Sequence, residues 1–290
     1  RGLTPNPCIE CNPRVKFAEL LRKADALDRE GIVTGHYARV ARSGDEWHLL
    51  RGIDGDRDQS YMLSRLPQRA LRRLVLPLGT LTKPQVRELA GEADLPAADR
   101  PDSQDICFAP DGDIAELIGR HRPEALERGP IFDEEGRELG RHRGLAHYTV
   151  GQRRGLGVGG PAGPWFVLRI DPERNALIVG AEEDLWVEEA EVGRLQLIGE
   201  VPGASFEADV MTRYRGAETS ATIEYGGERA VVRFHQPHRA PAPGQSAVFY
   251  DGERCLGGGV IVRPEQQMVD PSDSAECADS LLDEGEMPGD

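Results

Sequence analysis

The first 120 residues of the chain combine helical spacing with short apolar strands. Apolar side chains at positions 17, 20, 21, 24 and 27 predict a helix over residues 14–30, which Gly31 is suited to end. Residues 32–40 predict a buried strand, a glycine turn and a second extended piece. Two further helices are predicted, at 83–93 and at 111–119. Helices that follow strands in this way indicate an α/β layer.

From residue 129 onward the pattern changes to short alternating runs separated by turn residues. Gly226-Gly227 and Asp251-Gly252 are typical of β-hairpins, and the proline-rich run 235–244 predicts a loop. This half of the chain is therefore predicted to be all β, a small barrel or sandwich with a linking module. The predicted strands are 164–171, 175–180, 205–215, 220–225, 229–234, 246–250 and 255–262.

Charge separates the end of the chain from the rest. The formal net charge of the 290 residues is −15, but residues 264–290 hold nine Asp or Glu and no Lys or Arg, which leaves −6 for the remainder. That remainder can still present a local basic face to a nucleic acid. Residues 264–290 also lack periodicity, so a disordered acidic tail is predicted. No apolar run approaches the ~18 residues of a membrane span, which excludes an integral membrane protein.

Five scattered cysteines are not typical of a secreted disulfide scaffold, so a reducing cytoplasm is predicted. Cys8 and Cys11 form a CxxC pair, which is typical of half a zinc site or of a thiol redox motif at a helix N-terminus. No second ligand pair completes a zinc site, so no metal is predicted. Cys107 lies in the polar run DSQDICF, where both a reactive and an inert thiol are open. Cys255 and Cys277 are interpreted as bystanders.

Other polar segments are candidates for ligand contact. GLGVGG at 155–160 matches the dinucleotide fingerprint, but prolines follow where a helix is needed, so a flexible loop is predicted. Arg153 and Arg154 beside it suit phosphate contact or a solvated face. His36, after a glycine at a strand end, suits a ligand edge or a structural role. The run 57–61 suits RNA contact or a surface turn.

Eight motifs occur in one order between about residue 3 and residue 263, and together they closely resemble the tRNA-specific 2-thiouridylases, the MnmA (TrmU) family. They are TPNPCIECN, TGHYAR, RDQSYML, PLGTLTKPQVRELA, DSQDICF, YTVGQRRGLGVGG, RYRG and PGQSAVFYDGERCLGGGVI. The resemblance implies an α/β plus β fold. Residues 1–120 would be the remainder of a PP-loop ATP-pyrophosphatase (adenine nucleotide α-hydrolase-like) domain. Residues 121–185 would form a small central tRNA-binding domain, 186–263 a C-terminal β-barrel and 264–290 the acidic tail.

The resemblance also implies an activity, the ATP-dependent 2-thiolation of the wobble uridine of tRNA. The C2 oxygen would be adenylated, and a cysteine persulfide would supply the sulfur. By motif, Cys11 resembles the nucleophile, Cys107 the persulfide carrier and Gly35 an ATP contact. Asn6, Pro7 and Cys8 match contacts to the target base. His36, Arg57, Asp58, Gln59, Arg213, Tyr214 and Gln245 match tRNA contacts. The implied partners are ATP with Mg²⁺, the tRNA anticodon loop, a cysteine desulfurase or sulfur-relay protein as donor, and an external reductant, in the cytoplasm and without a membrane.

Two departures from the family pattern matter. The PP-loop signature, of the type SGGVDSS, is absent, so this chain is expected to lack most of its ATP site. Many members also have Asp where this chain has Cys8, and a thiol is a poor proton acceptor at neutral pH. Two other functions stay open on the residues: a non-catalytic tRNA-binding fragment, and a thiol-disulfide oxidoreductase built on the CxxC pair.

Overall fold

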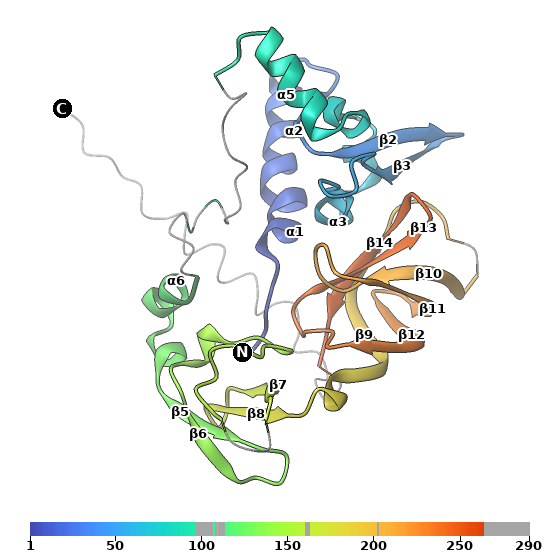
Figure 1. Cartoon of the computed structure of the whole chain (residues 1–290). Coiled ribbons are helices and arrows are strands. Elements are labelled where there is room, and N and C mark those ends of the chain that lie inside the picture. The colour runs from blue at the N-terminus through green and yellow to red at the C-terminus, as the bar shows by residue number, and fades with distance from the viewer. Residues whose placement is uncertain (97–106, 108, 110–113, 160–162, 202, 264–290) are drawn as a thin grey trace, which may run out of the picture.

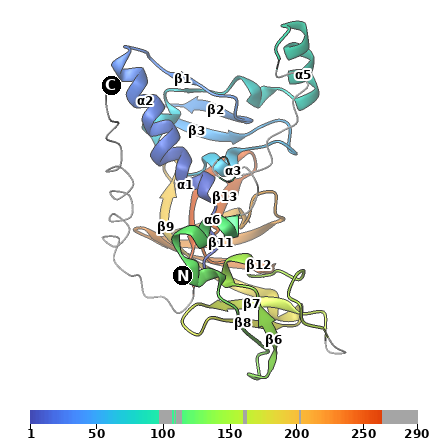
Figure 2. The same cartoon turned by 90° about the vertical axis from the view of Figure 1, so that its left-hand side faces the viewer.

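The computed structural model describes residues 1–96, 107, 109, 114–159, 163–201 and 203–263. These residues form three regions around three clusters of buried side chains, the first of which also includes side chains of the barrel. A long helical rod and an α/β layer stand above a β-barrel, and a small four-stranded sheet lies at the opposite end (Figures 1 and 2). The predicted α/β plus β fold is confirmed, because helices and a small α/β layer come first, a four-stranded sheet follows and a closed six-stranded barrel comes last. The boundaries at 120, 185 and 263 stay predictions, and the tail at 264–290 lies outside the described residues.

The rod joins three consecutive helical pieces, α1 (Pro7–Cys11), a π-helical turn (Asn12–Lys16) and α2 (Phe17–Ala26). The helix predicted over 14–30 therefore begins at Pro7 and ends at Ala26. It begins at Pro7 because proline suits the first helical position and the Asn6 side chain accepts a hydrogen bond from the Cys8 N–H. Beyond its end the chain turns through Asp28, which has a φ of 51°.

The α/β layer is small. β1 (Ile32–Val33) pairs in parallel with β4 (Leu74–Val75), while β2 (Ala38–Ser43) and β3 (Glu46–Arg51) form a hairpin. The helix predicted at 83–93 is confirmed as α5 (Lys83–Glu92), which the reciprocal capping box of Thr82 and Gln85 starts. The short elements between and after these are α3 (Ser60–Leu63), α4 (Gln68–Leu71), the 3₁₀ turn Pro77–Thr80 and α6 (Ile114–His121).

The central sheet has the strand order β6–β5–β8–β7 around a core that includes Ile131, Val167 and Leu177. Its strands are β5 (Gly129–Phe132), β6 (Glu138–His142), β7 (Phe166–Asp171) and β8 (Ala176–Gly180). β7 and β8 confirm the strands predicted at 164–171 and 175–180. Of the loop predicted at 155–160, residues 155–159 form neither helix nor strand, and residue 160 lies outside the described part.

Six strands make the barrel, in the order β13–β10–β11–β12–β9–β14, and the β13–β14 pairing closes it. They are β9 (Trp186–Leu197), β10 (Ser205–Met211), β11 (Glu218–Gly226), β12 (Arg229–Arg239), β13 (Ser246–Asp251) and β14 (Arg254–Ile261). The β2–β3 hairpin of the first region joins the same sheet, because Leu49 pairs with Cys255. The first region and the barrel therefore share buried contacts.

Three sequence predictions fail inside the barrel. β10 stops at Met211 instead of running to residue 215, because the chain turns there toward β11. β12 continues to Arg239 through the run predicted as a loop, and its register against β9 shifts between Arg233 and His238, where Pro237 can be accommodated. β9 was not predicted, since its many charged and exposed residues hide the alternation.

Candidate active site

The first turn of the rod carries the CxxC pair. Ile9 is completely buried, and the buried Asn12 side chain donates a hydrogen bond to the Met62 carbonyl at 2.8 Å. These two residues fix one face of the turn against the helix α3. Cys8 and Cys11 remain half-buried. Both thiols are therefore held on a rigid element and still open to a substrate.

Glu10, between the two cysteines, joins the rod to the rest of the molecule. Its carboxylate pairs with Arg65, with Arg194 of β9 at 3.1 Å and with Arg14 at 3.3 Å. Arg65 is 7% exposed, and burial lowers the pKa of its guanidinium. The barrel and the segment after α3 thus hold the CxxC turn through one carboxylate.

Cys107, from a distant part of the sequence, lies close to this turn. Burial raises the pKa of the Cys8 thiol, the nearby Cys107 and Cys11 thiols raise it further, and the Lys16 ammonium opposes the rise. All four described cysteines are free thiols, and Cys107 is exposed. Cys255 is buried in β14, where burial raises its pKa to about 12, as expected of an inert core thiol. The bystander Cys277 lies outside the described residues.

Gly35 and His36 follow the carboxyl end of β1, close to the rod. Gly35 is exposed, and a Cβ there would stand 3.5 Å from Leu78 Cδ1, so the edge is open. His36 Nδ1 lies 2.9 Å from the Thr34 hydroxyl, and its ring lies 5.6 Å from the ring of Phe17. Burial, with a smaller effect of Lys16, lowers the pKa of His36 to about 4, so the imidazole is neutral at pH 7.

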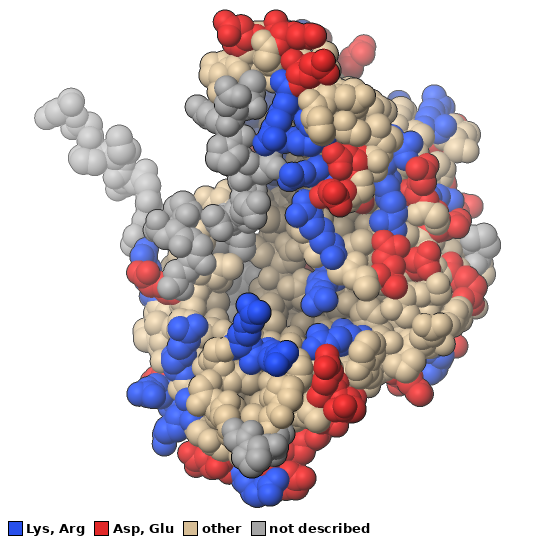
Figure 3. Space-filling view, in the orientation of Figure 1, with Lys and Arg blue, Asp and Glu red and all other residues tan. Residues whose placement is uncertain are grey.

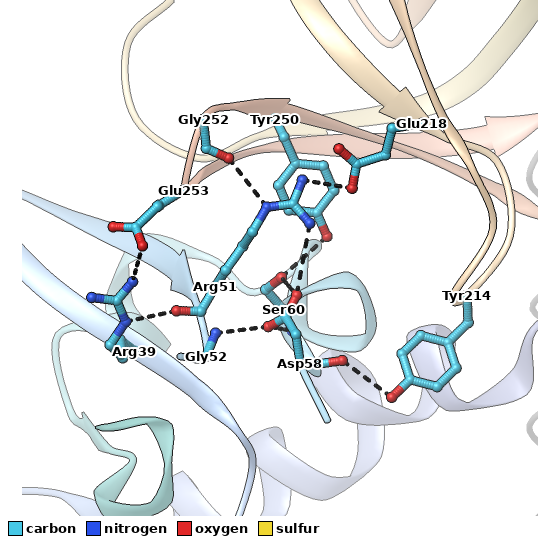
Figure 4. A network of polar contacts seen from close by, with 10 residues as sticks. All are labelled: Arg39, Arg51, Gly52, Asp58, Ser60, Tyr214, Glu218, Tyr250, Gly252 and Glu253. Atoms are coloured by element: carbon cyan, nitrogen blue, oxygen red, sulfur yellow. Dashed lines mark hydrogen bonds and ion pairs between the residues drawn. The ribbon is translucent and has the colours of Figure 1, made fainter. Parts of the chain in front are cut away.

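The loops 52–60 and 212–217 face each other across a pocket of about 450 Å³. Arg57 and Tyr214 line it, whereas Arg213 is exposed beside it. The Asp58 carboxylate accepts hydrogen bonds from the backbone N–H groups of Gly52 and Ser60 and from the Ser60 hydroxyl (Figure 4). Gln59 Oε1 accepts one from the Tyr37 N–H. The Asp58 and Gln59 side chains therefore shape this loop from within.

Arg51, which the sequence analysis missed, lies at the centre of this contact. Its guanidinium stacks on Tyr250 at 3.6 Å, donates to the Gly252 carbonyl at 3.1 Å and pairs with Glu218 at 2.8 Å (Figure 4). The Tyr214 hydroxyl donates to the Asp58 carbonyl at 3.1 Å. No sequence signal marks Arg51, because its partners come from strands far along the chain.

Gln245 lies on a loop that packs against the start of the rod. The Thr4 N–H donates to the Pro243 carbonyl at 2.8 Å, and a Cβ on Gly244 would stand 2.8 Å from the Thr4 nitrogen. The Thr4 hydroxyl also contacts the hydroxyl of Thr149 in the central domain. Segments of three sequence motifs therefore meet at Thr4, just before Asn6: TPNPCIECN, YTVGQRRGLGVGG and PGQSAVFYDGERCLGGGVI.

The described residues contain no group of three His, Cys, Asp or Glu that could hold a metal ion. No helix in that part of the chain is long and apolar enough to cross a membrane. Arg153 and Arg154 are exposed, and neither makes an ion pair with another described residue.

Family models match the chain in three consecutive pieces. A tRNA methyl transferase HUP domain matches residues 1–111, and a tRNA methyl transferase PRC-barrel domain matches residues 115–181. An aminomethyltransferase beta-barrel domain matches residues 187–261. The three matches cover most of the chain and follow the three regions of the fold.

Curated relatives give the same picture. The chain is 51% identical over 267 residues to the tRNA-specific 2-thiouridylase MnmA of Chloroflexus aggregans, covering 91% of this chain and 74% of that protein. It is 48% identical to the protein of the same name from Chloroflexus aurantiacus, with the same coverage. The corresponding protein of Carboxydothermus hydrogenoformans is 44% identical, over 90% of this chain and 72% of the relative.

Proposed function

This chain belongs to the tRNA-specific 2-thiouridylase family, and we propose that it replaces the C2 oxygen of the wobble uridine of tRNA with sulfur. The observation that supports the proposal beyond family membership is that Cys8 and Cys11 share one helical turn and that the Cys107 thiol is near enough to raise the pKa of Cys8. Sulfur transfer of this kind needs a thiol that carries sulfur and a second thiol that releases it.

Cys107 is the proposed carrier and Cys11 the proposed nucleophile. The terminal sulfur of a Cys107 persulfide attacks C2 of the activated uridine, and the C2–O bond breaks. Cys11 then attacks Cys107 Sγ and breaks the S–S bond, so the sulfur stays on the base and a Cys11–Cys107 disulfide forms. Two electrons from an external thiol reductant restore both thiols. The exposure of Cys107 suits its reloading by a sulfur donor, a cysteine desulfurase or relay protein.

ATP, with Mg²⁺, would supply the activation, because transfer of its AMP group to the C2 oxygen would release pyrophosphate and make that oxygen able to leave as AMP. The open edge after β1 would form one rim of the nucleotide site, since the carboxyl ends of parallel strands are where such ligands bind. Gly35 would border it. Asn6, Pro7 and Cys8 are the proposed contacts to the flipped base, which must leave its stack to reach the thiols.

The proposed tRNA contacts divide into two kinds. Arg57, Arg213 and Tyr214 lie at or beside the pocket between the two loops, where guanidinium and aromatic groups can meet phosphate and base. Asp58 and Gln59 act by holding one of these loops in shape. His36 lies beside Phe17 of the rod, and Gln245 lies on the loop that contacts Thr4 just before the rod. Both would contact the RNA nearer the thiols. Such an enzyme would act in the cytoplasm.

The test is a thiolation assay with the full-length enzyme on tRNA, with ATP and a persulfide donor, and with 2-thiouridine detected by mercury-affinity electrophoresis. We expect Cys107→Ser to lose both persulfide loading and thiolation, and Cys11→Ser to load sulfur without transferring it. Cys8→Ser should be milder. Cys255→Ala is the control, because that thiol is completely buried in β14. Full activity in Cys107→Ser would overturn the mechanism, and an active Cys11→Ser beside an inactive Cys8→Ser would exchange the roles of the two neighbours.

A further inference from the structure

The π-helical turn in the rod changes which side chain faces the thiols. The Phe17 N–H donates to the Asn12 carbonyl five residues earlier, so this turn holds one residue more than an α-turn. Every side chain beyond it is displaced by one position on the helix surface. Lys16 therefore stands where residue 15 of an unbroken α-helix would stand, seven positions after Cys8 and four after Cys11. Lys16 shares their face because of the π-turn.

Two further observations bring Lys16 near both the CxxC turn and the end of β1. Its neighbour Phe17 packs its ring against His36 at 5.6 Å, so this part of the rod lies beside the end of β1. The Lys16 charge also lowers the pKa of both Cys8 and His36, as a cation facing both groups does. These groups come from two different elements, and Lys16 is the cation that acts on both.

Lys16 is also available to bind an anion. Its side chain is exposed and makes no ion pair with any other described residue. The carboxylates of the rod have other partners: Glu10 pairs with three arginines, and Glu19 pairs with Arg22 and Lys23. Lys and Arg side chains also gather along a hollow in this face of the molecule, below α2 (Figure 3). A face on which cationic side chains gather in this way suits a polyanion such as RNA.

We propose that Lys16 binds a backbone phosphodiester of the substrate RNA beside the nucleotide whose base reaches Cys8 and Cys11. This inference rests on the proposed function. A phosphate held at that point would fix the backbone while the base turns toward the thiols, which is how phosphate contacts set the position of a nucleic acid. The π-turn is then the feature that puts Lys16 on the same helix face as Cys8 and Cys11.

The test is tRNA binding by the full-length protein, without ATP, over a series of salt concentrations. Lys16→Gln should weaken binding and lower the slope of log affinity against log salt by about one, the effect of one lost phosphate contact. Lys16→Arg should keep the slope. Lys23→Gln is the matched control, because Lys23 is an exposed lysine of the same rod that pairs with Glu19 at 3.7 Å, and it should leave the slope unchanged.

The outcomes separate the two proposals. An unchanged slope in Lys16→Gln, with tRNA binding intact in the wild type, overturns the inference alone. A slope that changes only when ATP is present also overturns it, because the phosphate would then belong to the nucleotide. No tRNA binding by the wild type overturns the proposed function as well. A second measurement needs no RNA: in a Cys11→Ser, Cys107→Ser background, Lys16→Gln should move the midpoint of Cys8 alkylation to higher pH, and an unmoved midpoint would place the ammonium away from the thiols.

Discussion

At the scale of single residues, Glu10 joins the turn that carries the thiols to Arg65 and to Arg194 of β9. Glu10→Gln leaves the buried Arg65 without its counter-charge, and we expect a loss of roughly 2–3 kcal/mol in the free energy of unfolding. Urea unfolding followed by circular dichroism measures it. Glu19→Gln, which removes an exposed pair on the same rod, should leave the midpoint unchanged. Equal midpoints for Glu10→Gln and the wild type would mean that Arg65 finds another partner.

At the scale of elements, His238 of β12 holds the turn between β10 and β11. Its Nε2 lies 2.7 Å from the Thr212 hydroxyl and its Nδ1 lies 2.8 Å from the Thr219 hydroxyl, at the two ends of the loop that carries Arg213 and Tyr214. Burial, with a smaller effect of Arg213, lowers the pKa of His238 to about 4. The loop is therefore built around a neutral imidazole.

This pKa predicts how stability changes with pH. The unfolded histidine takes up a proton near pH 6.5, and the folded one only near pH 4. The stabilisation is therefore complete above about pH 6.5 and is lost as the pH falls toward 4. His238→Gln should be less stable at pH 7 and should lose less stability between pH 7 and pH 5 than the wild type, as urea unfolding at the two pH values would show. His235→Gln, exposed on the same strand, is the control, and an identical pH dependence in wild type and His238→Gln would contradict the prediction. His36 titrates in the same direction, so part of the dependence should remain.

The docking of the 3₁₀ turn Pro77–Thr80 against β2 gives a second prediction at this scale. A Cβ on Gly79 would stand 1.8 Å from the Ala38 carbonyl oxygen, a backbone atom that cannot move without disturbing the hairpin. Gly79→Ala should destabilise the protein by about 3 kcal/mol, measured by thermal or urea unfolding. Gly91→Ala in α5 is the matched control, because a Cβ there meets open space. It should be neutral or slightly stabilising, and a similar loss in both variants would show that the close approach at Gly79 is not the cause.

At the scale of the whole molecule, Arg51 and Arg213 both lie where the loops 52–60 and 212–217 face each other. Substituting each by Ala should have a different effect on stability and on the salt dependence of tRNA binding. The Arg51 guanidinium is used within the protein, so Arg51→Ala should lower stability and tRNA affinity while leaving the salt slope unchanged. Arg213 is exposed, so Arg213→Ala should lower the slope by about one. Salt-dependent tRNA binding and urea unfolding of both variants check this. An unchanged slope in Arg213→Ala would make that arginine part of a solvated face.

Much of the fold was predictable because it depends on neighbours in the sequence. The helix α5 follows from Thr82, Pro84 and Gln85, which start a helix by local hydrogen bonding in any context. The strand β11 follows from alternation, and β7 and β8 follow from short apolar runs bounded by turn residues within a few positions. The motif order that identifies the family is also a property of the sequence alone. These features need no contact between distant segments.

The tertiary structure decided what distant segments do to one another. β9 is a strand because β12 and β14 pair with it, although its own charged sequence hides the pattern. Leu49 joins the barrel through Cys255, and Arg51 acquires its role from Tyr250, Gly252 and Glu218. The π-turn turns Lys16 to the face of the cysteines, which α-helical periodicity does not predict. The physical reason is the same in each case: periodicity records which side of an element is buried, whereas the partner that a side chain meets is fixed only when the elements pack.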